Sequence, residues 1–381
     1  MHDARLIIYK IRMVNYMKSI CSKEKCTGCG LCVDFCPQKA ITLFKSVKNV
    51  LAIIDEKKCV KCNHCFKICP SINPVKKNNV LSWSQGWSKD SLVRVNSSSG
   101  GVATELSRYY ILNGGIVVSC CFIDNEYKYK IASKLDDLDK FSGSKYVKSN
   151  PINIYKEIKK LIDNKVNVLF IGLPCHVAAI KKIIGDSEYI LLVDLICHGT
   201  PSPLLFNKYI SEHKNNDNEF KFRNKGKYGL NIKNNPGITD AYMLSFLYGL
   251  SFTENCYSCN YSNINRVSDI TLGDSWGSEL KSEMKNGISL ILCSTNKGVD
   301  IIKKLNLELH PVDINNAIKN NMQLKKPYKK PKNYEKFMRY MEKNKNYTWS
   351  VIKILPIQSI KQMIKLILIK LKLYPKMYDD N

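Results

Sequence analysis

The sequence predicts three structural parts: a small α+β domain rich in cysteine, a larger α/β body, and a helical C-terminal tail. Three observations lead to this prediction. Two related cysteine motifs lie between Cys26 and Pro70, helical and apolar strand patterns alternate from Val80 onwards, and the segment from Trp349 to Lys376 is dense in lysine and aliphatic residues. A chain of 381 residues is long enough to give such parts a hydrophobic core.

The 16 cysteines are the first unusual feature of the composition. No secretory signal is apparent at the start of the chain, where charges interrupt the apolar stretch. We therefore expect a cytoplasmic protein whose cysteines bind metal rather than form disulfides. Residues 1–16 precede a further methionine, Met17, and we interpret them as an extension or a misassigned start.

The formal net charge of +26 is the second unusual feature, and it predicts attraction to an acidic partner. Biased base composition is an alternative cause, because asparagine and isoleucine are abundant as well. Arginine, which nucleic-acid readers favour, supplies only seven of the 59 basic residues. Since no zinc-finger, RNP or helix-turn-helix pattern occurs, we expect no nucleic-acid partner.

The motif C-x2-C-x2-C-x3-C-P occurs twice, as CTGCGLCVDFCP (26–37) and CVKCNHCFKICP (59–70). This spacing is typical of two-cluster ferredoxins, in which the fourth cysteine of each motif binds the cluster of the other. The predicted ligand sets are Cys26, Cys29, Cys32 and Cys69 for one 4Fe-4S cluster, and Cys59, Cys62, Cys65 and Cys36 for the second. Structural zinc is the alternative, but zinc ribbons use C-x2-C pairs and leave the other cysteines unexplained. Cys21 belongs to neither set.

Short apolar runs between the motifs, AITLF and VLAIID, predict a hairpin that covers the clusters. The body begins with SSSGGVATEL, which we interpret as a serine-capped helix that Gly114 and Gly115 end, followed by a strand over 116–122. A helix at INIYKEIKKLIDN, a strand at VNVLFIG, a helix at PCHVAAIKKII and a strand at YILLVDLI follow. Their apolar strands indicate a parallel sheet, and three further strands are expected at SDITLGD, ISLILCS and LELHPVD.

Ligand sites of such sheets lie where parallel strands end, and two cysteines fall there. Cys175 and Cys197 each follow a strand, while Cys256 and Cys259 form a C-x2-C pair on a loop. Together these four thiols predict a third 4Fe-4S cluster. The alternative is that Cys175 or Cys197 only fills the core, as we expect for Cys120, Cys121 and Cys293.

His176 and His198 adjoin these cysteines and are the candidate catalytic residues, as proton relays or cofactor partners. The alternative for each is a purely structural, hydrogen-bonded histidine. Neither a G-x-G-x-x-G motif after a strand nor a P-loop occurs, so any redox cofactor needs a site of another design.

Five segments of the body resemble the coenzyme F420 hydrogenase/dehydrogenase beta subunit family, with its fused N-terminal two-cluster ferredoxin domain. They are SSSGGVATEL (97–106), FSGSKYVKS (141–149), LFIGLPCHVAAIK (169–181), LLVDLICHGTPSP (191–203) and CYSCNYSNINRVSDITLGDSWG (256–277). The resemblance implies FAD, and a 4Fe-4S cluster held by the four cysteines of the body. Leu173 and His176 depart from the threonine and glutamine that family members often carry there.

The family motifs also imply flavin contacts, for which the candidates are Ser99, Gly100, Gly101, Ser144, Lys145 and Tyr146. Glycines let backbone amides approach a pyrophosphate, and Lys145 offers it a positive charge. The alternative is a simple helix cap and a solvated lysine. Asp269, Asp274 and Trp276 match the family and are expected to shape the site.

The predicted fold is thus an α+β ferredoxin-like dicluster domain (17–79), an α/β flavin-binding body (80–313) and a basic helical tail (314–381). Lysines interrupt every apolar stretch of the tail, so we expect no transmembrane helix. It is expected to pack on the body, lie on an anionic membrane surface or dock a partner helix.

The predicted function is that of an oxidoreductase. Electrons would pass between a protein donor or acceptor, the ferredoxin clusters and FAD, with hydride exchange to an organic substrate or to the deazaflavin coenzyme F420. The alternative is a non-catalytic electron-transfer subunit that docks a separate enzyme, for example in polysaccharide biosynthesis.

Overall fold

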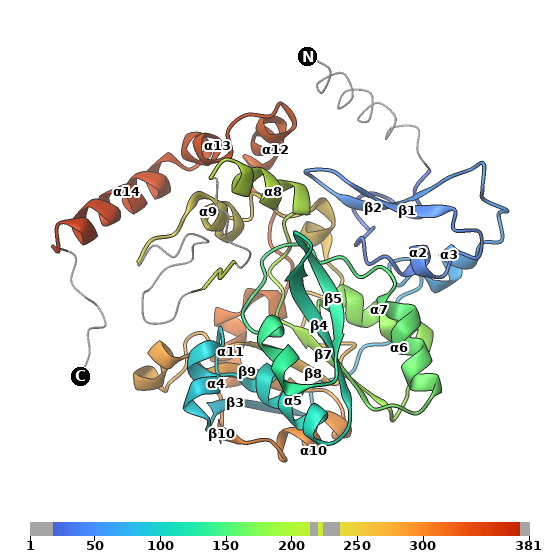
Figure 1. Cartoon of the computed structure of the whole chain (residues 1–381). Helices are drawn as coiled ribbons and strands as arrows, with labels where there is room; N and C mark the ends of the chain where they lie inside the picture. Colours follow the sequence, from blue (N-terminus) through green and yellow to red (C-terminus); the bar gives the residue numbers. More distant parts are fainter. Residues whose placement is uncertain (1–17, 214–219, 224–236, 374–381) are drawn as a thin grey trace.

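The computed structural model describes residues 18–213, 220–223 and 237–373 (Figure 1). The expected extension over residues 1–16 lies outside these ranges, as does the end of the predicted tail.

The N-terminal domain combines two short helices with one hairpin. Strands β1 (Ile41–Lys45) and β2 (Val50–Ile54) pair antiparallel, with Leu43 opposite Ala52, which confirms the predicted hairpin. Helices α2 (Leu31–Asp34) and α3 (His64–Ile68) each start inside a cysteine motif. Gly28 and Gly30 both have positive φ, and a Cβ at Gly28 would lie 2.6 Å from the carbonyl oxygen of Val50. Glycine therefore lets the first motif turn tightly against the hairpin.

A large mixed sheet forms the centre of the body. Its strand order in the described residues is β10-β3-β9-β8-β7-β6-β4-β5. Strands β4 (Ile116–Ile123), β6 (Val168–Gly172), β7 (Ile190–Leu195) and β8 (Ile270–Asp274) run parallel. Strands β3 (Ser82–Ser88), β5 (Glu126–Ala132), β9 (Ser289–Cys293) and β10 (Leu307–His310) pair antiparallel with their neighbours. The parallel centre confirms the parallel sheet that the apolar strand patterns predicted. Strands β3 and β5 were not predicted.

Helices cover both faces of this sheet. Helices α6 (Ile154–Asp163) and α7 (Pro174–Ile184) pack on one face, and α5 (Val102–Leu112) and α10 (Asn296–Ile302) on the other. The helix α5 begins after Gly101, whose φ is 91°, and no side chain caps it. The predicted serine cap is therefore wrong, because Ser97 instead ends the preceding helix α4 (Ser91–Asn96), where its hydroxyl donates to the carbonyl of Val93.

The remaining helices form a second core beside the sheet. Residues of α8 (Pro203–Ser211), α9 (Ala241–Leu247), α12 (Tyr334–Glu342) and α13 (Tyr347–Ile354) pack into one aromatic cluster. Helix α11 (Ile314–Asn320) packs near the sheet, and α14 (Pro356–Lys370) follows α13. The predicted helical tail is thus present, with α12 and α13 buried against the body. No helix within the described ranges is long and apolar enough to cross a membrane.

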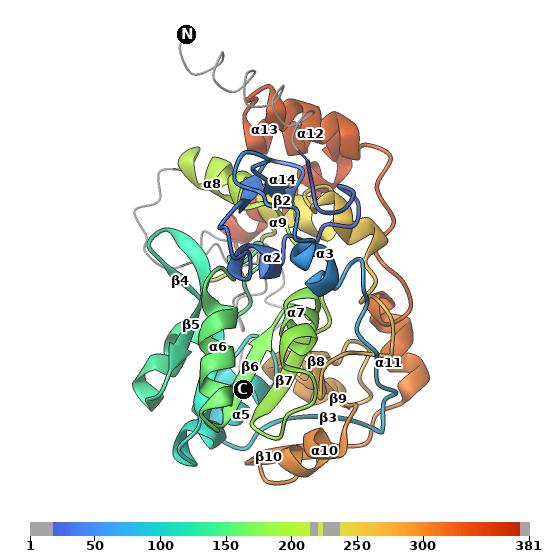
Figure 2. The same ribbon diagram turned by 90° about the vertical axis from the view of Figure 1, so that its right-hand side faces the viewer.

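Figures 1 and 2 show how these parts are arranged. In both views the N-terminal domain (blue) and the helices α12 and α13 (red) lie at the same end of the body. The carboxyl ends of β4 and β6 to β8 are the natural place for ligand sites in a sheet of this kind.

Candidate metal and cofactor sites

The N-terminal domain brings four cysteines of the two motifs around one small cavity. Cys36 of the first motif lines it together with Cys59, Cys62 and Cys65 of the second. We call these four residues the outer set, because Cys62 is exposed and the other three are partly exposed. The crossover arrangement predicted from the spacing requires this combination of residues.

The remaining cysteines of the motifs lie deeper. Cys26, Cys29 and Cys32 are buried and Cys69 is partly buried. We call these four residues the inner set. Hydrogen bonding with the Cys21 thiol lowers the pKa of both Cys26 and Cys69. Cys21, which matched neither motif, therefore lies beside two cysteines of the inner set.

Four cysteines of the body line a second small cavity. Cys175 lies in the first turn of α7, Cys197 follows β7, and Cys256 and Cys259 lie on and just after a 3₁₀ turn (Glu254–Ser258). We call these four residues the body set. Cys175 and Cys197 meet because β6 and β7 are adjacent and parallel, so the segments after them leave the same edge of the sheet.

Two buried cations lie at the body set. Lys148 is 3% exposed, and its Nζ lies 3.6 Å from the Sγ of Cys175. Burial lowers the pKa of Lys148, whereas negative charge on the neighbouring cysteines, Cys175 first among them, raises it. Arg266 is 2% exposed and lies 3.7 Å from Asp194, while its Nε and Nη2 have no hydrogen-bond partner among the described residues.

These features fit an anionic iron–sulfur cluster. Four thiolates would bring negative charge into a buried site, which the ammonium of Lys148 and the guanidinium of Arg266 can balance. Within the described residues, no three Cys, His, Asp or Glu side chains converge as they would around a single metal ion. In a 4Fe-4S cluster each thiolate binds a different iron, so its ligands stand further apart than around one ion.

Hydrogen bonds join the inner set to the body. The hydroxyl of Tyr155 in α6 donates to the carbonyl of Cys29 at 2.6 Å, and the backbone N–H of Asn153 donates to Asp34 at 2.8 Å. Cys29 packs in one apolar cluster with Cys175 and Cys259. The inner set therefore adjoins both the outer set, with which it shares an apolar cluster, and the body set.

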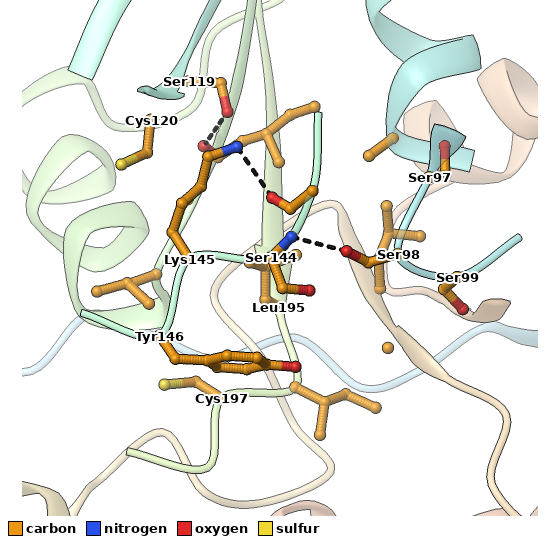
Figure 3. A pocket seen from close by; sticks show the side chains of 18 of the residues that line it. Ser97, Ser98, Ser99, Ser119, Cys120, Ser144, Lys145, Tyr146, Leu195 and Cys197 are labelled. Atoms are coloured by element: carbon orange, nitrogen blue, oxygen red, sulfur yellow. Dashed lines mark hydrogen bonds between the residues drawn. The ribbon is translucent and has the colours of Figure 1, made fainter. Parts of the chain in front are cut away.

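A larger cavity, of about 280 Å³, opens at the carboxyl ends of the parallel strands. Figure 3 shows Ser97 to Ser99 on one side of it, Ser144 to Tyr146 on another, and Cys197 below. Of the candidate flavin residues, Ser99, Gly101, Ser144, Lys145 and Tyr146 line this cavity. Gly100 lies behind the wall, where its N–H donates to the hydroxyl of Ser289.

Lys145 stabilises its own loop through hydrogen bonds. Its ammonium donates to the carbonyls of Phe141, Ser142 and Gly143, and the N–H of Ser144 donates to the hydroxyl of Ser98 at 2.7 Å. These bonds give the two loops a fixed position on either side of the cavity. A direct contact between Lys145 and a pyrophosphate stays a prediction.

The structure adds a residue to the cavity that the sequence did not single out. Arg223 forms an ion pair of 2.7 Å with Asp274, and its guanidinium lies 5.7 Å from the ring centre of Trp276. All three residues line the cavity. Asp269, by contrast, lies outside it and accepts hydrogen bonds from the N–H of Leu192 and the hydroxyl of Thr295.

The two candidate histidines have different surroundings. His176 is fully buried, its Nδ1 lies 2.9 Å from the hydroxyl of Tyr129, and it lines neither cavity. Burial lowers its pKa well below the usual value, which favours the neutral form, and a catalytic role of His176 stays a prediction. His198 lines both the large cavity and the cavity of the body set, and burial lowers its pKa as well.

The two cavities share one wall. The segment from Cys197 to Thr200 lines both of them, together with Leu173. A group held by the body set would therefore adjoin a group held in the large cavity.

Comparisons with known proteins identify two segments of the chain. Residues 166–314 match the family described as the C terminus of the coenzyme F420 hydrogenase/dehydrogenase beta subunit, and residues 25–73 match the 4Fe-4S dicluster domain. One similar solved chain comes from the F420-reducing NiFe hydrogenase complex of Methanosarcina barkeri, studied as a xenon derivative. It shares 21% identity at a TM-score of 0.47, and the match covers 65% of this chain and 91% of that chain. No curated protein matches the sequence. The two family matches confirm the resemblance inferred from the motifs.

Proposed function

We propose that this chain is an iron–sulfur flavoprotein oxidoreductase. The proposal starts from its matches to a 4Fe-4S dicluster domain and to the coenzyme F420 hydrogenase/dehydrogenase beta subunit family. Electrons would enter or leave at the exposed outer set and pass towards the large cavity. An organic molecule, or a deazaflavin such as coenzyme F420, would exchange hydride there.

The observation that carries this proposal is the wall shared by the two cavities. Cys197 lines both, so one proposed cluster ligand also forms part of the wall of the proposed cofactor cavity. The inner set adjoins the body set through Cys29, which supports a continuous row of cysteine sites. When bound, the clusters supply single-electron transfer, and a flavin supplies the conversion between hydride and single electrons.

The residues around the large cavity fit a flavin. The ring system needs a largely apolar slot with a few polar groups, and the serines of residues 97–99 and 144 supply hydroxyl and amide groups at its edge. Arg223 brings a positive charge for an anionic part of the cofactor or substrate, while Asp274 holds its guanidinium in place. Neutral His198 offers a proton acceptor at the shared wall.

Anaerobic purification with measured iron, sulfide and flavin per chain tests the proposal. About twelve irons and one flavin are expected, since three clusters of four irons are proposed. The variant Cys256→Ser should lose about four irons and keep the rest. The control Cys293→Ser, in the core strand β9, should keep the full iron content. A protein that carries no flavin and cannot be reconstituted with FAD or FMN would contradict the proposal.

A second candidate is a non-catalytic electron-transfer subunit, which the exposure of Cys62 in the outer set favours. It predicts a full set of clusters, no flavin, and a stable complex with a separate enzyme. Iron and flavin analysis separates the two candidates, because only the first requires a cofactor in the large cavity.

A further inference from the structure

Helix α14 (Pro356–Lys370) is the least buried helix of the C-terminal part. Ser359 is its buried residue, and it contacts the body through α13 and α9. On its inner side, the side chain of Gln362 accepts a hydrogen bond from the N–H of Thr239. Figure 1 shows α14 at the outer edge of the molecule.

The outer side of α14 is apolar along its whole length. Ile357, Ile360, Ile364, Ile367 and Leu371 recur at intervals of three and four residues, so they form one stripe of the helix. With Met363 beside them, these residues make up what we call the outer stripe, and each is more than half exposed. Exposure of six large aliphatic side chains in one continuous stripe is unusual for a free surface and indicates a partner.

The charges around the stripe identify the kind of partner. At 100° per residue, Lys361, Lys365 and Lys372 fall on one flank of the stripe and Lys370 on the other. No aspartate or glutamate occurs between Glu342 and Asp379 in the sequence. A helix with an apolar face, lysines along both flanks and no acidic residue is typical of helices that lie in the headgroup region of anionic bilayers.

Two other partners fit this pattern less well. The apolar stripe has the spacing of a coiled coil but extends over only about two heptads, which is short for that structure. Pairing with a second copy of α14 would bring lysines together without acidic residues to balance them. The exposed Trp349 on α13 adds a residue that is typical of the membrane interface.

We propose that α14 binds the surface of an anionic lipid bilayer, lying in the plane of the interface with the outer stripe buried among the acyl chains. The lysines on its flanks then contact the lipid phosphates. This inference does not depend on the proposed redox function, because it rests on α14 and α13 alone.

Flotation of the purified holoprotein with vesicles tests the proposal. The probe is a phosphatidylcholine vesicle with or without phosphatidylglycerol, at low and at high salt. We expect binding to the anionic vesicles, weakened by salt, and at least about tenfold weaker binding to phosphatidylcholine alone.

Two variants separate the apolar and the electrostatic contributions. The combined change Ile360→Gln, Ile364→Gln and Ile367→Gln should reduce vesicle binding by about tenfold or more, since it removes apolar area from the stripe. Lys361→Gln with Lys370→Gln and Lys372→Gln should weaken binding to the anionic vesicles specifically. The matched control is Leu92→Gln with Val95→Gln on α4, where the side chains are 72% and 67% exposed, and it should bind as the unchanged protein does.

Iron content and the ultraviolet–visible spectrum show whether each variant is folded. Absence of binding to anionic vesicles by the unchanged protein would overturn the proposal, as would equal binding by the apolar variant. A dimer in light scattering that the apolar variant converts to a monomer would also overturn it, because the outer stripe would then bind a second copy.

Discussion

The ammonium of Lys148 lies 3.6 Å from the thiol of Cys175, in a site where the lysine is almost completely buried. A buried lysine is costly unless negative charge balances it. Negative charge on Cys175, Cys256, Cys197 and Cys29 raises the pKa of Lys148, so the body set and the inner set both contribute. We infer that Lys148 sets the charge around the proposed cluster of the body set.

Replacement of Lys148 by methionine should lower the reduction potential of that cluster. Loss of one positive charge beside Cys175 disfavours the more negative, reduced state, by up to about 200 mV if the effective dielectric constant is about 20. A redox titration followed by electron paramagnetic resonance measures the shift. The control is Lys159→Met on the exposed side of α6, where Lys159 pairs with Asp163. An unchanged potential in a fully loaded Lys148→Met protein would contradict the inference.

The surface around the outer set should bind an acidic electron carrier. Val60 is 60% exposed next to Cys62, and exposed lysines surround them at Lys57, Lys58, Lys61 and Lys67. The double variant Lys57→Glu and Lys61→Glu should slow electron transfer from an acidic ferredoxin by about tenfold at low salt, because it reverses the local charge.

Stopped-flow measurement at increasing salt provides the check on this surface. The difference between the variant and the unchanged protein should shrink as the ions screen the charges. Lys159→Glu with Lys160→Glu, on α6 of the body, serves as the control and should keep the original rate. If both double variants slow the transfer equally, only the overall charge of the protein matters.

Tyr155 should stabilise the contact between the N-terminal domain and the body. It is fully buried, and its hydroxyl donates to the carbonyl of Cys29. Tyr155→Phe removes the donor and should lower the stability by about 1 to 2 kcal/mol, since the buried carbonyl loses its partner. Urea denaturation, monitored by the loss of cluster absorbance, measures the change in stability. The control is Tyr109→Phe on α5. Equal midpoints for the two variants would rule out this role for Tyr155.

Much of this arrangement could be predicted because it is encoded locally. The spacing of Cys26 to Cys36 and of Cys59 to Cys69 identifies iron–sulfur ligands without any knowledge of the fold. The continuous apolar runs of β6 and β7 indicated a parallel pair, and that pairing places Cys175 and Cys197 together. The family match confirms the domain type, while the ligand role of each cysteine stays a prediction.

Other features depend on contacts between distant segments and could not be predicted. Strand β3 has the polar sequence SWSQGWS and forms only because β9 and β10 pair with it from both sides. Lys148 and Arg266 lie within segments that resemble the family but were not singled out, and only the fold brings them and Arg223 to the cavities. Cys21 likewise gains its place from the fold of the N-terminal domain.

Gly100 shows why the segment SSSGG (97–101) needs glycine at this position, and it provides the last prediction. A Cβ there would lie 2.3 Å from the carbonyl oxygen of Gly86 in β3 and 2.8 Å from the amide nitrogen of Ser289. Both are backbone atoms of the sheet, so neither can move aside easily. Gly100→Ala should therefore push the loop of residues 97–101, which we call the serine loop, out of the cavity wall. The expected loss of stability is about 3 kcal/mol.

The flavin content should fall in Gly100→Ala, while the iron content stays near that of the unchanged protein, because no cysteine set contacts Gly100. The control is Gly114→Ala, where a Cβ would meet no atom within 4 Å and only the positive φ of 73° causes strain. That strain costs about 1 kcal/mol, so the control should keep its flavin. Thermal unfolding together with flavin and iron analysis measures all three quantities. Equal flavin contents in the two variants would show that the serine loop does not contribute to flavin binding. The large cavity would then need a different ligand.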